Sequence, residues 1–142
     1  VYVAISVHCS NKQKKRDVLI PSIFSDGKVF ADAGYNVIIA GDFNTTPEQW
    51  KRYNLMGFRT DSCALDTDDN RQITNINPDG SFADRIDYIF TNFREQFKLC
   101  SEVIEGIEGT TLPRNKRTFC TEWKENGHDH AMVIDTFCIQ KN

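Results

Sequence analysis

The chain has 142 residues, of which 39% are hydrophobic and 26% are charged, and its formal net charge is −3. This length and composition are typical of one soluble globular domain with a sizeable core. The negative net charge provides no overall attraction to a polyanion. No apolar run approaches the roughly 18 residues that a membrane-spanning helix needs.

The first part of the chain predicts a strand, a helix and a second strand. Residues 1–7 are rich in β-branched residues, and residues 37–41 form another apolar run that is typical of a strand. Between them, apolar residues fall loosely at helical spacing over residues 13–33. Pro21 and Gly27 interrupt that segment, so the pattern predicts a helix that is broken or partly loop.

The remaining elements are shorter and mostly extended. Thr46 and Pro47 are typical of an N-cap and a first helical residue, which predicts a short helix to about Asn54. Residues 72–76 are expected to pair with the strand that comes after the turn at 77–80. Because most strands are close in sequence and helices are few, the fold class is predicted to be α+β. Further strands are predicted over residues 58–60, 82–91, 99–104 and 131–139, and a long connection over 105–127.

The chain begins directly on a strand, at Val1, without an initiator methionine, a signal peptide or a polar lead-in. We therefore expect residues 1–142 to be a single domain that starts in the middle of a fold. The five cysteines include no CxxC pair, and their odd number allows two disulfides with one thiol left over. A secreted and an intracellular protein both fit this count, so the localisation is left open. These cysteines are Cys9, Cys63, Cys100, Cys120 and Cys138.

Four short stretches place polar, ionisable residues at the ends of apolar strands, where functional sites are usually built. They read VHCS at 7–10, GDFN at 41–44, DRIDYIF at 84–90 and HDHAMV at 128–133. In GDFN, Asp42 and Asn44 flank a phenylalanine, so the alternation of a strand predicts that both point to the same side.

Each of these residues also has a structural interpretation when it is taken alone. Asn44 would cap a helix, and Asp87 would be a carboxylate paired with a donor inside its strand. A single histidine at a strand end more often has a structural role. His128 and His130 would suit a zinc site with Cys120, although no further pair of ligands supports one.

Taken together and in this order, the four stretches resemble the motifs of the endonuclease/exonuclease/phosphatase superfamily. This is the family of pancreatic deoxyribonuclease, abasic-site endonucleases, neutral sphingomyelinases and inositol polyphosphate 5-phosphatases, and the resemblance covers nearly the whole chain. It implies a deoxyribonuclease-I-like sandwich of two sheets flanked by helices, of which the chain would hold the C-terminal half or more. Two departures stand out: His128 replaces the serine of the family, and the half that supplies a metal-binding glutamate is absent.

The resemblance also implies roles for individual residues. Hydrolysis of a phosphodiester needs an activated water, stabilisation of charge on the phosphoryl oxygens and help for the leaving group. His130 would be the general base or would orient the attacked phosphate, and Asp87 would hold its imidazole in one tautomer. Asp42 would orient the nucleophilic water or protonate the leaving oxygen.

The same resemblance implies three further roles. Asn44 would donate a hydrogen bond to a phosphoryl oxygen, and His8 would contact the phosphate from the opposite side. Asp129 would help to bind a hard divalent cation, Mg²⁺ or alternatively Mn²⁺ or Ca²⁺.

The substrate is less determined than the chemistry. Basic clusters at 12–16 and 114–117 would suit a nucleic-acid backbone, and they favour a nuclease that prefers DNA. They would also suit an anionic membrane surface, which leaves a lipid phosphodiesterase or a phosphoinositide phosphatase as an alternative. The expected partner is the N-terminal half of the same fold, from a precursor or another chain. A catalytically inactive binding module, or one chain of a split enzyme, is the alternative of a different class.

Overall fold

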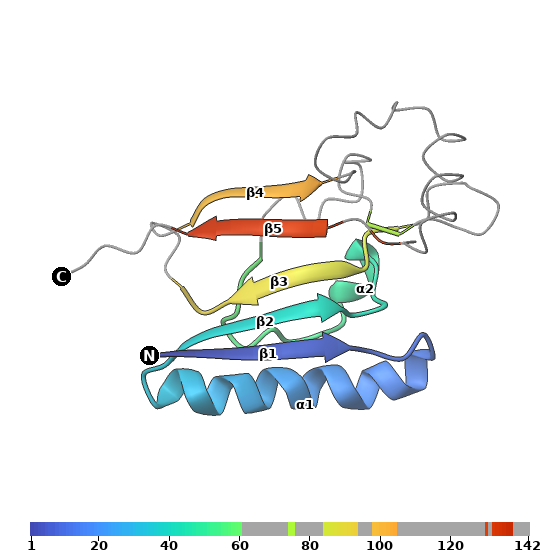
Figure 1. Cartoon of the computed structure of the whole chain (residues 1–142). Coiled ribbons are helices and arrows are strands. Elements are labelled where there is room, and N and C mark those ends of the chain that lie inside the picture. Colours follow the sequence, from blue (N-terminus) through green and yellow to red (C-terminus); the bar gives the residue numbers. More distant parts are fainter. Residues whose placement is uncertain (61–73, 76–83, 94–97, 105–129, 131, 138–142) are drawn as a thin grey trace.

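The computed structural model describes residues 1–60, 74–75, 84–93, 98–104, 130 and 132–137, with the backbone alone for 98–104 and 132–137 (Figure 1). Its strands form a three-stranded sheet in the order β1-β2-β3 and a two-stranded sheet of β4 and β5. The elements are β1 (Tyr2–His8), α1 (Gln13–Asp32), β2 (Asn36–Asp42), α2 (Pro47–Trp50), β3 (Asp87–Thr91), β4 (Lys98–Ile104) and β5 (Met132–Phe137).

The three-stranded sheet is mixed, because β1 and β2 run parallel while β3 runs antiparallel to β2. The parallel pair is joined by α1, which packs against the sheet along β1 and β2 (Figure 1). The pair of β5 and β4 is antiparallel, and β5 lies beside β3. Within the described residues, this mixed sheet with its helices agrees with the predicted α+β class, whereas the packing of two sheets into a sandwich is not seen.

Helix α1 runs unbroken through both residues that were expected to interrupt it, so that expectation is wrong. Pro21 lies on the exposed side of the helix. Gly27 is buried, and a Cβ atom there would lie 2.9 Å from Ile39 Cδ1 and 3.0 Å from Phe58 Cζ. Gly27 therefore lets the helix approach the sheet closely, and it is a packing requirement rather than a break.

The buried side of α1 is not the one that its apolar residues suggested. Val18 is 75% exposed, and Leu19 and Phe30 are also exposed. The buried positions recur every three or four residues and therefore form one face of the helix. Two of them, Ile20 and Phe24, are fully buried.

The core lies between α1 and one face of the sheet. Alternation along each strand places every second side chain on this face. Phe24 of α1 contacts Phe43, Trp50, Phe58 and Phe90 in edge-on or stacked pairs. Such ring pairs add stability beyond the area that they bury. The strand residues on this face are Val3, Ile5, Val7, Val37, Ile39, Tyr88 and Phe90.

The other face of the sheet, which we call the open face, carries side chains of β1 and β2 that are exposed or half-buried. Tyr2, Ala4 and Ser6 of β1 are exposed there, and Ile38 and Ala40 of β2 are half-buried. Most of the large apolar side chains of β1 and β2 point toward α1 instead, because alternation along the strands places them on that face.

Several predicted boundaries shift. Strands β1 and β2 lie where the sequence placed them, whereas α2 ends at Trp50 rather than near Asn54. Thr46 is the N-cap of α2 and Pro47 begins it, as predicted. Residues 58–60 contribute only an isolated bridge from Arg59 to Thr91. The predicted turn at 77–80 and the connection at 105–127 lie outside the described residues.

Candidate active site

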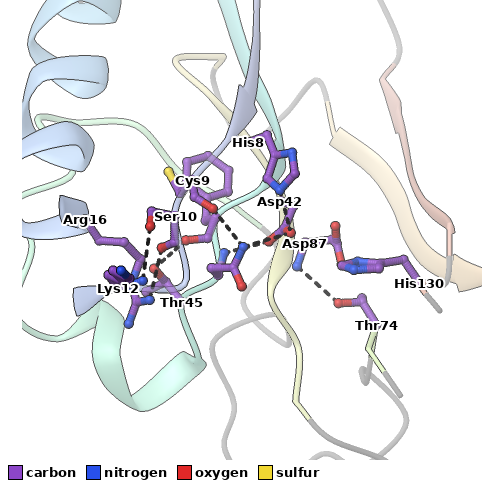
Figure 2. A network of polar contacts seen from close by, with 12 residues as sticks. His8, Cys9, Ser10, Lys12, Arg16, Asp42, Thr45, Thr74, Asp87 and His130 are labelled. Carbon is purple, nitrogen blue, oxygen red and sulfur yellow. Dashed lines mark hydrogen bonds and ion pairs between the residues drawn. The ribbon is translucent and has the colours of Figure 1, made fainter. Parts of the chain in front are cut away.

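Three of the predicted site residues form one row across the open face. His8 is the last residue of β1, Asp42 is the last of β2 and Asp87 is the first of β3. The strand register pairs His8 with Asp42 and Asp42 with Asp87. Because paired residues on neighbouring strands point to the same side, the three side chains stand next to one another at one edge of the sheet (Figure 2).

Gly41 and Phe43 of the GDFN stretch fix the position of the β2 end that carries Asp42. Gly41 adopts a φ of 140°, and a Cβ atom there would lie 2.0 Å from the Val7 carbonyl oxygen, so only glycine lets β2 approach β1 so closely. Phe43 is fully buried and packs against Trp50 and Phe90. The aromatic ring therefore anchors the end of β2 in the core, while Asp42 faces the other way.

Asn44 fixes the Asp42 carboxylate. Its backbone N–H donates to Asp42 Oδ1 at 2.7 Å, and its Nδ2 donates to Asp42 Oδ2 at 2.9 Å and to the Cys9 carbonyl oxygen at 2.8 Å. The φ of Asn44 is 49°, a left-handed conformation that asparagine tolerates better than most residues. Both amide hydrogens are thus committed to protein oxygens, and donation to a phosphoryl oxygen would replace one of these bonds.

Asp42 carries an electrostatically strained carboxylate. Burial raises the pKa of Asp42 above its usual value, and the negative charge of Asp87 adds to this, whereas the hydrogen bond from the Asn44 backbone opposes it. On its other side, His8 Nε2 lies 3.7 Å from Asp42 Oδ2, with the His8 side chain 84% exposed. The row therefore has a solvent-facing imidazole at one end and a held carboxylate at its centre.

The other end of the row is closed by His130, which lies just before β5. His130 Nδ1 is 2.8 Å from Asp87 Oδ2, and the two side chains are 33% and 17% exposed. Because an ionised carboxylate can only accept, the imidazole donates through Nδ1 and leaves Nε2 as its other functional nitrogen. The expected hydrogen bond between these residues, 43 positions apart in sequence, is therefore present.

The buried guanidinium of Arg16 holds the loop after β1. Arg16 is 5% exposed, and its Nη1 donates to the carbonyl oxygens of Ser10 and Asn11. Its Nη2 donates to the side-chain oxygens of Gln13 and Gln49. Since Gln49 also accepts from the backbone of Thr46 at 3.2 Å, Arg16 links the loop after His8 to the start of α2.

Two residues of this site carry no recognisable sign of their role in the sequence. Arg16 belongs by sequence to the basic cluster at 12–16, a phosphate-binding candidate, but it faces inward. Thr74 is 1% exposed, and its hydroxyl oxygen accepts hydrogen bonds from the backbone of Ile86 and Asp87. A single threonine in a polar segment carries no sequence signal for such a contact.

Some predicted site residues lie outside the part of the chain that the structure describes. These include Asp129, the proposed metal ligand, and His128 and Cys120 of the alternative zinc site. Among the described residues, no three His, Cys, Asp or Glu side chains are grouped as a metal site. No helix in the same part of the chain is long and apolar enough to cross a membrane.

Comparison with known proteins identifies the chain at the level of a family. A search of curated proteins found no significant match. A family profile, by contrast, matches residues 14–97, which contain both the Gly41–Asn44 stretch and Asp87. With the row at the sheet edge and this match over more than half its length, the chain belongs to the Endonuclease/Exonuclease/phosphatase family.

Proposed function

We propose that this protein hydrolyses phosphodiester bonds in nucleic acid, with DNA as the preferred substrate and Mg²⁺, Mn²⁺ or Ca²⁺ as the cofactor. Membership of the family suggests metal-dependent hydrolysis of phosphodiesters or phosphate esters, since its members are typically hydrolytic enzymes that use divalent metal ions. The observation that carries the proposal is the Asp87–His130 hydrogen bond at the end of the His8–Asp42–Asp87 row.

His130 and Asp87 would act as a unit. With Nδ1 donating to Asp87 Oδ2 at 2.8 Å, the imidazole has a fixed tautomer and a fixed plane. Its Nε2 would then accept a proton from the attacking water or contact the attacked phosphate. The carboxylate of Asp87 would stabilise the positive charge that the ring gains in the first of these roles.

Asp42 would serve the opposite side of the reaction. A carboxylate whose pKa is raised by burial is better suited than an ordinary one to hold a proton for a leaving oxygen. Its two hydrogen bonds from Asn44 keep it aimed along the row. Because the His8 side chain is largely exposed, it would approach a bound phosphate from solvent and donate a hydrogen bond to it.

The described carboxylates do not provide a metal site by themselves. Asp42 is bonded to Asn44, and Asp87 is bonded to His130. Both are hard oxygen donors of the kind that Mg²⁺ prefers, so the chemistry of the edge suits that ion, but a complete set needs further ligands. We assign one of them to Asp129, which adjoins His130 in sequence. The cation would supply charge neutralisation at the phosphoryl oxygens when bound.

The choice of nucleic acid rests on the lysines that come after β1. Lys12, Lys14 and Lys15 are exposed and begin only four residues after His8. Lys12 lies in the loop after β1, near the end of the sheet that carries the row (Figure 2). A polyanion that crosses this edge would meet several positive charges, whereas one phosphate needs fewer. We also propose that the open face is covered by a second sheet, as in a deoxyribonuclease-I-like sandwich, from an N-terminal segment of a precursor or a partner chain.

A nicking assay tests the function. Supercoiled plasmid is incubated with the protein and Mg²⁺, and with a chelator as the control. We expect relaxation only with the metal, and a loss of about 100-fold or more in rate for His130→Ala and for Asp87→Asn. Asp32→Asn, an exposed change at the far end of α1, is the matched control and keeps full activity.

The same preparation is assayed on sphingomyelin and phosphoinositide vesicles. Faster turnover of a lipid than of DNA would replace the nuclease with the lipid alternative. No hydrolysis of DNA, RNA or lipid under any metal condition would overturn the enzymatic proposal and leave the inactive binding module.

A further inference from the structure

We infer that Thr74 is a positioning residue for the reaction proposed above, because its hydroxyl and the backbone beside it hold both members of the Asp87–His130 pair. The inference rests on the proposed function for its catalytic readout, but its geometry stands by itself. Thr74 lies outside every motif that the sequence brought forward, and it is 1% exposed.

Thr74 holds the backbone at Asp87, the first residue of β3. Thr74 Oγ1 accepts from the backbone N–H of Ile86 at 3.0 Å. It also accepts from the backbone N–H of Asp87 at 3.1 Å (Figure 2). A hydroxyl oxygen has two lone pairs, and here both are used. The Thr74 oxygen thus accepts two backbone hydrogen bonds that a further strand would otherwise accept at the start of β3. It thereby fixes the backbone that carries the Asp87 carboxylate.

The residue that follows Thr74 contacts the backbone of His130. Asn75, the next residue, forms an isolated antiparallel bridge with His130. The backbone N–H groups of Thr74 and Asn75 also donate to the Asp84 carbonyl oxygen, at 3.3 and 3.1 Å. This dipeptide is therefore bonded to the strand that carries the acid and paired with the segment that carries the imidazole.

The consequence is a common support for two groups that are far apart in sequence. The 2.8 Å separation of His130 Nδ1 and Asp87 Oδ2 depends on both backbones keeping their places. Removing the Thr74 hydroxyl takes this acceptor from the buried N–H of Ile86 and the partly buried N–H of Asp87, so the start of β3 must shift to find water or another oxygen. A shift of about 1 Å in a catalytic pair costs on the order of 100-fold in rate.

The test compares Thr74→Val with Thr74→Ser and with Thr91→Val. Valine keeps the shape of threonine but has no hydroxyl, whereas serine keeps the hydroxyl. Thr91 is a second buried threonine at the opposite end of β3, so its change to valine controls for a general loss of stability. We expect Thr74→Val to lower kcat by about 10-fold or more with KM within about twofold. Thr74→Ser and Thr91→Val should keep kcat near the wild-type value.

A second readout does not need catalysis. The proton on His130 Nδ1, hydrogen-bonded to a carboxylate, should give a low-field NMR resonance in the wild type and in Thr74→Ser, and this resonance should be lost in Thr74→Val. If Thr74→Val does not fold, hydrogen exchange of the wild type decides: the amides of Ile86 and Asp87 should exchange as slowly as that of Phe90.

The outcomes separate the two proposals. A wild type with the low-field resonance but no hydrolysis of any substrate would sink the proposed function and leave the support by Thr74 standing. The inference about Thr74 is overturned if Thr74→Val keeps both kcat and the resonance, or if Thr74→Ser behaves like Thr74→Val. It is also overturned if Thr91→Val lowers kcat equally, or if those two amides exchange fast.

Discussion

Asp42 illustrates the conflict between stability and chemistry in a single side chain. Burial raises its pKa, so the folded state favours the protonated form. A group with a raised folded-state pKa stabilises the fold fully below its unfolded pKa, and that contribution is lost as the pH rises through the folded pKa. At neutral pH, the buried charge of Asp42 therefore works against folding, and its retention there points to a role outside stability.

We predict that Asp42→Asn lowers the rate of phosphodiester hydrolysis by about 100-fold or more, yet leaves the free energy of unfolding at pH 7 equal to or above that of the wild type. The difference in stability should shrink as the pH falls toward 4, where the wild-type carboxylate takes up its proton. Urea unfolding at both pH values measures it. A clear loss of stability at pH 7 would show that the bonds from Asn44 outweigh the cost of burying the charge.

Cys9 comes directly after His8 of the row but belongs to the core. It is 1% exposed and forms no disulfide, and burial raises the pKa of its thiol to about 11. A pKa of about 11 instead of 9.0 lowers the thiolate fraction at pH 8 roughly 100-fold. Its value to the site lies in its backbone, which donates to the Asp42 carbonyl and accepts from Asn44.

We therefore predict that Cys9 is not alkylated by iodoacetamide in the folded protein at pH 8 and is alkylated fully in urea. Peptide mapping by mass spectrometry identifies the Cys9 peptide among those of the other cysteines. Rapid labelling of Cys9 without denaturant would mean that the end of β1 opens readily.

At this scale the sequence predicted the residues whose chemical type is unusual for their place. Asp42 and Asp87, carboxylates in apolar strands, and the imidazoles of His8 and His130 were identified, and the structure brings all four together. The supporting roles of Thr74 and Arg16 were not predicted, because their residue types carry no signal for such a role. A threonine or an arginine can be exposed or buried, and only the fold decides which carbonyls or amides it will meet.

At the scale of elements, the close approach of β1 and β2 depends on one residue. A Cβ atom at position 41 would lie 2.0 Å from the Val7 carbonyl oxygen, which is backbone and cannot turn aside. Gly57 also has a positive φ, of 86°, but a Cβ atom there meets nothing within 4 Å. A side chain at either position would be strained by the positive φ. At position 41 alone, it would also collide with the backbone of β1.

We predict that Gly41→Ala destabilises the protein by at least about 3 kcal/mol. Gly57→Ala should cost only the left-handed strain of about 1–2 kcal/mol. Chemical denaturation of both variants measures the difference. Equal losses would show that β1 withdraws easily and that the parallel pairing tolerates a wider spacing.

The elements were predicted well where packing and local pattern agree. Residues 2–8 and 36–42 alternate against a helix, and their β-branched side chains favour strands in any context. The prediction failed for α1, because Pro21 and Gly27 were judged by local propensity alone. The structure places the proline on the solvent side and uses the glycine for contact with Ile39, and neither position can be known before the helix has a partner.

For the molecule as a whole, the most informative surface is the open face of the sheet, which is exposed along β1 in the described part of the chain. Its β1 residues Tyr2, Ala4 and Ser6 are exposed, although they alternate with residues of the core. The small side chains of Ala4 and Ser6 allow another layer to approach this face closely. The site row lies at one end of this same face, so whatever covers the face also borders the site.

We predict that the 142-residue chain, purified alone, associates through this face in a concentration-dependent manner. Ala4→Glu should reduce the association, because a charge in a buried interface is costly. Val18→Glu, on the exposed side of α1, should leave it unchanged. Sedimentation analysis measures all three proteins. A monodisperse, cooperatively unfolding monomer at every concentration would show that the sheet is stable without a cover.

The hydrogen bonds of Arg16 and the side chains of the row differ in how they respond to pH and salt. The four oxygens that accept from Arg16 are neutral, two from the backbone and two from side-chain amides. Because these oxygens are neutral, their hydrogen bonds to the guanidinium do not depend on an acid titration, and salt screens them only weakly. In the row above, burial raises the pKa of the Asp42 carboxylate, so mild acid protonates it while the hydrogen bonds of Arg16 remain. Activity that is lost in mild acid should therefore return on neutralisation without refolding of the protein.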